Sequence, residues 1–215
     1  MPNAVLQDLA VDRKNPNLLA AAGQIYKSGW PMMGVFISSD GGTNWTQAPV
    51  SSKKDSYAYA VARDPVNPSI LYVGGQNGQW KPLLCKSANG GASWTDITKG
   101  IRGTIIDVAV DPASPRIVYA VEWGGSVWKS GDGGGSWTEL SIRGGYRLII
   151  NPNQPNELFL GTAYDGVFYS ADQGATWKDF SADMDIKYIR CLDLDPAARI
   201  LYASTEGGGI YKGSF

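Results

Sequence analysis

The chain has 215 residues with 19 Lys and Arg against 20 Asp and Glu, and its net charge of −1 offers no basic field to nucleic acid or anionic lipid. It contains no His, which excludes His-based triads, His general bases and most zinc sites, so we expect no metal and no cofactor. The 27 Gly, 8 Trp and 11 Tyr are typical of many short strands joined by tight turns.

The first residues, Met1 to Val5, carry neither a basic region nor a long apolar run, so we expect no signal peptide in this chain. No later apolar run has the length of a transmembrane helix, and we expect no membrane insertion. Cys85 and Cys191 lie in different repeats and are predicted to be unpaired, half-buried thiols.

One element occurs five times in chain order: a short apolar strand that ends at an Asp or Asn, which we call the anchor residue. The anchors are Asp12, Asp64, Asp111, Asn151 and Asp195, and a proline follows four residues after each of the first four. The anchors are spaced by about 40 to 50 residues, which is the period of propeller blades. In the third repeat, the pattern predicts strands at 104–110, 117–121, 125–129 and 136–140.

A second element, which we call the hairpin motif, follows the first four anchors and reads S-x-(D/N)-x-G-x-x-W. Its residues are Ser38, Asp40, Gly42 and Trp45; Ser87, Asn89, Gly91 and Trp94; Ser130, Asp132, Gly134 and Trp137; and Ser170, Asp172, Gly174 and Trp177. Ser and Asp side chains can bond nearby backbone N–H groups, and Gly accepts a positive φ. We predict a structural role, because one carboxylate per copy is too few for the roughly six to eight oxygens of Ca²⁺.

This motif resembles the Asp box of the bacterial-neuraminidase repeat, found in sialidases, sortilin-type receptors, xyloglucan-hydrolysing enzymes and photosystem II assembly factors. The resemblance implies a β-propeller and an extracytoplasmic location, although the chain itself leaves its localisation unknown. We predict one all-β domain, a β-propeller of five blades with about four antiparallel strands each, the last blade lacking its outer strand. The predicted blades are residues 5–50, 57–99, 104–140, 145–181 and 187–215. A part of a larger ring is the alternative.

Function is expected on the face formed by the loops between the second and third strands, because these loops differ between repeats. The ligand-binding candidates there are Tyr26, Trp30, Gln76, Trp80, Trp123, Tyr164, Asp165 and Glu206. Aromatic faces beside amides and carboxylates suit either a glycan or a protein partner. The alternative, for Trp123 especially, is that the ring covers a neighbouring blade.

Three further candidates, Asp8, Asp107 and Arg147, stand four residues before their anchors and are expected at the mouth of the central channel. Two acids about 5 to 9.5 Å apart would suit glycoside hydrolysis. We favour the simpler interpretation, in which Arg147 forms an ion pair with an Asp.

The motifs that identify the enzymes of this family are poorly matched in this chain. The F/Y-R-I-P motif of sialidases is absent, and Pro115-Arg116-Ile117 belongs to the repeated turn. The xyloglucanase-like enzymes use two aspartates between two propellers, and this chain is large enough for one. We therefore predict a non-catalytic binding or scaffold propeller that recognises a protein or glycan. A glycoside hydrolase, or a fragment of one, is the alternative. A second copy of the chain could complete the open fifth blade.

Overall fold

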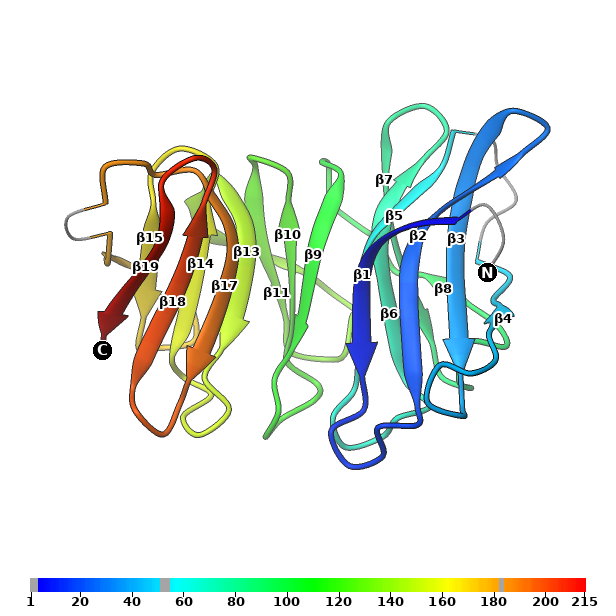
Figure 1. The fold of residues 1–215 in the computed structure, drawn as a ribbon, viewed down its shortest axis with the longest axis horizontal. Coiled ribbons are helices and arrows are strands. Elements are labelled where there is room, and N and C mark those ends of the chain that lie inside the picture. Colours follow the sequence, from blue (N-terminus) through cyan, green and yellow to red (C-terminus); the bar gives the residue numbers. More distant parts are fainter. Residues whose placement is uncertain (1–3, 51–54, 182–183) are drawn as a thin grey trace.

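The computed structural model describes residues 4–50, 55–181 and 184–215, which form five antiparallel sheets and no helix (Figure 1). Four sheets have four strands and the last has three. In each sheet the strands are paired in chain order, so every sheet is a simple meander. The prediction of five blades, the last without its outer strand, is confirmed. None of the described residues forms a helix that could span a membrane.

The blades follow one another along the chain. Blade 1 contains β1 (Ala4–Val11), β2 (Leu19–Lys27), β3 (Trp30–Ser38) and β4 (Thr46–Gln47), and blade 2 contains β5 (Tyr57–Arg63), β6 (Leu71–Asn77), β7 (Lys81–Ser87) and β8 (Thr95–Asp96). Blade 3 contains β9 (Ile105–Val110), β10 (Val118–Glu122), β11 (Ser126–Ser130) and β12 (Thr138–Arg143). Blade 4 contains β13 (Gly145–Ile150), β14 (Leu158–Thr162), β15 (Val167–Ser170) and β16 (Lys178–Asp179), and blade 5 contains β17 (Ile189–Asp195), β18 (Ile200–Thr205) and β19 (Gly209–Ser214).

The hydrophobic core consists of four clusters of buried residues, one between each pair of successive blades. Alternation along each strand sends one set of side chains to the preceding blade and the other set to the following blade. Val118 and Ala120 thus face blade 2, whereas Tyr119 and Val121 face blade 4. No core cluster of the described residues joins blade 5 to blade 1.

The innermost strand of every blade carries a register shift at the same place. The extra residues are Gln7, Tyr59, Ile106, Tyr146 and Arg190, and each immediately precedes the channel-mouth position of its blade. A β-bulge bends its strand and re-aims a side chain. All five bulges lie near the end of the innermost strand that is closest to the loops between the second and third strands.

The hairpin motifs are tied by the side chains that the sequence singles out. In the first motif the Ser38 hydroxyl donates to Asp40 (2.8 Å) and accepts from the N–H of Gly42 (2.9 Å). The same pair of bonds recurs in the other three motifs. The indole of Trp45 donates to the carbonyl of Gly42, whereas that of Trp137 donates to Ile97 on the preceding blade. The motif thus stabilises its own turn, and in blade 3 it also bonds the preceding blade.

Both cysteines are free, as predicted. Their burial differs from the prediction, because Cys85 is buried in the core between blades 1 and 2 and Cys191 is exposed. Burial raises the pKa of the Cys85 thiol to about 12.

Candidate functional site

The loops between the second and third strands of the blades lie at one end of the molecule, opposite the anchor turns (Figure 1). Large aromatic side chains are exposed on this loop face: Tyr26, Trp30, Trp80, Trp123 and Tyr164. Trp80 and Tyr164 each expose about three quarters of their surface, at 75% and 76%. Trp123 is 59% exposed, so this ring does not serve as a buried cover over a neighbouring blade.

Three tyrosines gather where blades 4 and 5 meet on this face, and we call them the tyrosine cluster. The ring of Tyr188 lies 5.7 Å from that of Tyr146 and 6.0 Å from that of Tyr164, centroid to centroid. Arg190 stacks over Tyr188 (4.9 Å to the ring centroid) and donates a hydrogen bond to the Tyr146 hydroxyl (3.1 Å). Its other nitrogen forms an ion pair with Glu206 (2.8 Å).

Local geometry explains how residues far apart in sequence meet here. Tyr146 and Arg190 are the bulge residues of β13 and β17, so their side chains depart from the regular alternation of the strand. Tyr164 lies in the β14–β15 loop, and Glu206 in the β18–β19 loop donates its N–H to the Tyr188 carbonyl (3.0 Å). Partial burial and the neighbouring Tyr146 raise the pKa of Tyr188, so the phenol is neutral at pH 7 and stays so above the ordinary pKa of tyrosine.

This arrangement provides aromatic surface next to a guanidinium–carboxylate pair, a combination that can stack on the C–H face of a sugar and bond its hydroxyls. Of the residues that the sequence predicts, Tyr164 and Glu206 belong to the cluster. Asp165 lies beside it, exposed, with its N–H donating to Thr162 (2.9 Å).

A pocket of about 320 Å³ lies at the loop-face end of blade 2, where Tyr57 and Trp80 line it. Tyr57 stacks on the bulge residue Tyr59 with nearly parallel rings (5.9 Å, 5°). Gln76 lines this pocket but is buried, and its amide oxygen accepts a hydrogen bond from Thr104 of blade 3 (2.9 Å). The structure thus gives Gln76 a bond between blades, and its role in ligand binding stays a prediction.

The structure brings Asp8, Asp107 and Arg147 within electrostatic reach of one another at the channel mouth. Arg147 donates to Asp107 at 3.2 Å, which is the ion pair that we favoured over a catalytic pair. Each carboxylate also accepts a backbone N–H of the following blade: Asp8 from Val61 (2.8 Å) and Asp107 from Leu148 (2.6 Å). Both acids are therefore hydrogen-bonded across a contact between blades.

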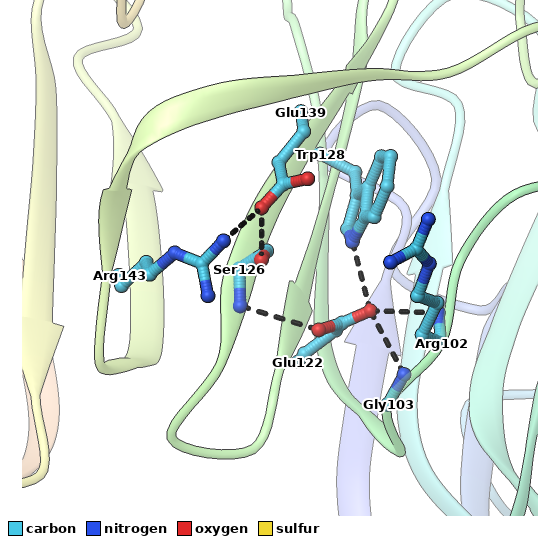
Figure 2. A network of polar contacts seen from close by, with 7 residues as sticks. All are labelled: Arg102, Gly103, Glu122, Ser126, Trp128, Glu139 and Arg143. Atoms are coloured by element: carbon cyan, nitrogen blue, oxygen red, sulfur yellow. Dashed lines mark hydrogen bonds and ion pairs between the residues drawn. The ribbon is translucent and has the colours of Figure 1, made fainter.

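A further acid of the loop face, Glu122, is also engaged by the protein (Figure 2). Its carboxylate accepts the N–H groups of Arg102, Gly103 and Ser126 and the indole N–H of Trp128. Burial opposes ionisation of Glu122, but the bonds from Gly103, Arg102 and Trp128 outweigh burial and lower its pKa. A carboxylate with so many donors holds loops together and is a poor general acid.

At the opposite end of the channel, the anchor turns of blades 1 to 4 surround a cavity of about 250 Å³. Arg63 lines it and donates one hydrogen bond to the carbonyl of Pro68. Its Nε and second terminal nitrogen are buried and have no hydrogen-bond partner among the described residues. Sequence reasoning assigned this end to scaffold and missed the cavity.

Sequence reasoning also missed Tyr146 and Tyr188 and left Arg190 without a role. The signal that could have found Tyr146 and Arg190 is their position immediately before the channel-mouth residue, where every blade has its bulge. Tyr188 has no such signal, because it precedes β17 in an irregular segment.

The sheets, their order and their repeated turns define the class of protein: a β-propeller. No protein-family model matches the chain. A curated relative, the xyloglucanase of Hypocrea jecorina, is 27% identical over 219 residues, which cover 96% of this chain but 24% of the enzyme. The chain therefore spans about a quarter of the length of that relative.

Solved structures give the same fold. An ancestral GH74 enzyme aligns with a TM-score of 0.74 at 22% identity, over 94% of this chain and 28% of its own. The GH74 enzyme of Niastella koreensis aligns with a TM-score of 0.61 at 22% identity, over 96% of this chain and 44% of its own. YCF48 bound to D1 peptide aligns with a TM-score of 0.52 at 12% identity, over 100% of this chain and 95% of its own. The chain is similar to propellers of both kinds.

Proposed function

We propose that the chain is a non-catalytic binding propeller whose loop face recognises a β-glucan polysaccharide of the xyloglucan type. The observation that carries this proposal is the tyrosine cluster with its Arg190–Glu206 pair. Exposed aromatic surface stacks on sugar rings, and the charged pair supplies donors and acceptors for hydroxyl groups. The exposed Trp80 and Trp123 offer further stacking surfaces along the same face.

One observation favours a glycan over other ligands, and a second argues against hydrolysis. The curated relative is a xyloglucanase, and its similarity to this chain extends over 96% of the chain. The acids that hydrolysis would need are bonded to the protein's own backbone, as described for Asp8, Asp107 and Glu122. In this proposal the hairpin motifs are Asp boxes that act as scaffold, and the loop face carries recognition.

The test is calorimetric titration of the purified chain with xyloglucan oligosaccharides. We expect measurable binding and a loss of about tenfold in affinity for Tyr164→Ala, taking as a guide the roughly 1–3 kcal/mol that an aromatic ring contributes when it stacks on a nucleic-acid base. Val66→Ala is the control, because this exposed side chain lies in the anchor turn of blade 2, at the end opposite the loop face. Absence of binding, or equal losses in the two variants, would contradict the proposal.

A glycoside hydrolase is the second candidate, and the GH74 structures favour it. It would use Asp8 and Asp107. Reducing-sugar release from xyloglucan distinguishes the two candidates: we expect none from the wild type, whereas turnover that Asp107→Asn abolishes would establish the hydrolase. A protein ligand is the remaining outcome, since one similar propeller is YCF48 bound to D1 peptide.

A further inference from the structure

In blades 2 and 3, a pair of side chains joins the blade to the next one. In blade 2, the Tyr72 hydroxyl and the Lys86 ammonium both donate to the carbonyl of Gly133, in the hairpin motif of blade 3 (3.3 and 2.8 Å). In blade 3, Tyr119 and Lys129 both donate to the carbonyl of Gln173, in the hairpin motif of blade 4 (3.2 Å each). We call such a pair a Tyr–Lys clamp.

The two clamps are built identically. Tyrosine and lysine are direct cross-strand partners on the second and third strands of the blade. The ammonium lies over the tyrosine ring, 5.4 Å from its centroid in blade 2 and 5.7 Å in blade 3. Gly133 and Gln173 occupy the same place in the motif, directly after its aspartate. In blades 2 and 3 the clamp thus bonds the hairpin motif of the following blade, whereas the equivalent pair of blade 1, Ala20 and Ile37, has no donor side chain.

Blade 5 carries a third pair of this kind, Tyr202 and Lys212, which are again cross-strand partners on the second and third strands. No acceptor for either side chain is present among residues 4–50, 55–181 and 184–215. Tyr202 is 38% exposed, whereas Tyr72 and Tyr119 are 1% and 0% exposed under the following blade. Blade 4, whose following blade has no hairpin motif, has Phe159 and Tyr169 in these positions instead.

Blade 1 presents the complementary surface. Its hairpin motif places Gly41 where the clamped Gly133 and Gln173 stand, and Gly41 is exposed whereas Gly133 is buried. Leu9, three residues before its anchor, is 53% exposed. The equivalent residues of blades 2 to 5 are covered by the preceding blade: Val61, Val108, Leu148 and Leu192 are 4%, 7%, 3% and 6% exposed. Blade 1 thus exposes the surface that the preceding blade covers in blades 2 to 5.

We propose that the free side of blade 5 docks onto blade 1 of a second copy of this chain. Tyr202 and Lys212 would donate to the carbonyl of Gly41, and Leu9 would be covered as its equivalents are. The partner is a second copy because both complementary surfaces belong to this chain and, in one copy, Leu9 and Tyr202 both remain exposed. The contact is head-to-tail, so it builds closed rings or open filaments of copies. It is independent of the ligand proposed for the loop face.

The first experiment is native mass measurement over a range of protein concentrations. We expect dimers or larger assemblies in the wild type. Tyr202→Ala/Lys212→Ala and Leu9→Asp, which alter opposite sides of the contact, should each weaken assembly by at least about tenfold. All three residues are exposed, so the fold should persist, and far-ultraviolet circular dichroism checks this. The matched control is Tyr164→Ala/Lys81→Ala, which removes an exposed tyrosine and an exposed lysine elsewhere.

The second experiment distinguishes a second copy from closure within one chain. Asn17, whose carbonyl accepts the N–H of Gly41 (3.1 Å), is changed to Cys in one preparation and Lys212 to Cys in another, both with Cys191→Ser. A disulfide-linked dimer on mixing supports the proposal. A wild type that is monomeric at all concentrations, or assembly that neither variant weakens, overturns it. A third preparation carries Asn17→Cys and Lys212→Cys in the same chain, and the proposal is also overturned if this variant forms only an intramolecular disulfide. If the wild type assembles but binds no glycan, only the proposed function is refuted.

Discussion

Asp107 accepts a hydrogen bond from the backbone N–H of Leu148 at 2.6 Å, so a carboxylate of β9 is bonded directly to the innermost strand of the next blade. Its other oxygen accepts from its own neighbour Val108 (3.0 Å) and from Arg147. Asp8 bonds Leu9 and Val61 in the same way between blades 1 and 2. The channel acids therefore join the inner strands of successive blades, so substituting them should change the stability of the protein.

Burial raises the pKa of Asp107 to about 6, although Arg147 and the Leu148 N–H oppose this shift. The unfolded chain has a carboxyl pKa of about 3.9, so the folded state binds more protons between about pH 4 and 6. Stability from this group is complete below pH 4 and is lost as the pH rises through 6. We expect Asp107→Asn to remove up to about 3 kcal/mol of pH dependence from the free energy of unfolding.

Urea unfolding of wild type and Asp107→Asn at several pH values between 4 and 7 measures this difference. Other titrating groups are common to both proteins and cancel. A difference in unfolding free energy that stays constant over this range would show that Asp107 does not titrate there.

Glu122→Gln should destabilise the protein through the loops that the carboxylate joins (Figure 2). The amide can no longer accept at both positions, so we expect a loss of about 1–3 kcal/mol in the free energy of unfolding near pH 7. Because the pKa of Glu122 is lowered in the folded state, this contribution is lost as the pH falls through that pKa.

Glu139→Gln is the control for Glu122, since Glu139 bonds the exposed Arg143 and the hydroxyl of Ser126. An exposed ion pair contributes about 0–1 kcal/mol, so the urea midpoint should move much less than for Glu122→Gln. Equal shifts for the two variants would show that the hydrogen bonds to Glu122 contribute no more stability than those of the exposed Glu139.

The hairpin motif makes a prediction about Asp172, whose pKa is lowered to about 2 by bonds from the Thr176 hydroxyl, the Thr176 N–H and Ser170. Thr176→Ala removes the first of these donors, so the pKa of Asp172 should rise toward about 3.9. Carbon-detected NMR titration of the carboxyl resonances measures it. Asp132, in the equivalent motif of blade 3, should keep its low pKa in the same sample. An unchanged Asp172 would show that the hydroxyl contributes nothing.

Repeated local chemistry made the fold predictable from the sequence. The predicted strand at 104–110 is observed as β9 (Ile105–Val110), and the outer strand predicted at 136–140 begins at Thr138 and extends to Arg143. The outer strand was placed less well because the hairpin motif occupies its first residues. In blades 1, 2 and 4 the outer strand has only two residues.

The candidate site was less predictable, because its residues meet through backbone irregularities. Regular alternation would direct Tyr146 and Arg190 to one side of their strands. Their position directly before the channel-mouth residue recurs in every blade, but only the structure shows that this position is a bulge. The loop aromatics Trp80 and Tyr164 could be found because their loops vary between repeats. Gln76 also lies at a loop, but its buried bond to Thr104 depends on the packing of blade 3 against blade 2.

Gly75 tests the bulge of blade 2 directly. It pairs with Ala58 beside the register shift, and a Cβ on Gly75 would lie 1.9 Å from the carbonyl oxygen of Tyr57. Backbone must move to admit even a methyl group, so Gly75→Ala should cost about 1–3 kcal/mol in the free energy of unfolding. Gly131→Ala is the control, because a Cβ there meets nothing within 4 Å, and its effect should stay within about 0.5 kcal/mol. Urea denaturation of both variants measures the effects.

Since Tyr59 is the bulge residue and stacks on Tyr57, Gly75→Ala should also disturb the stacked rings, and altered near-ultraviolet circular dichroism would show this. If the two variants unfold alike, the inner strand is not held against β6 in the bulged register described here.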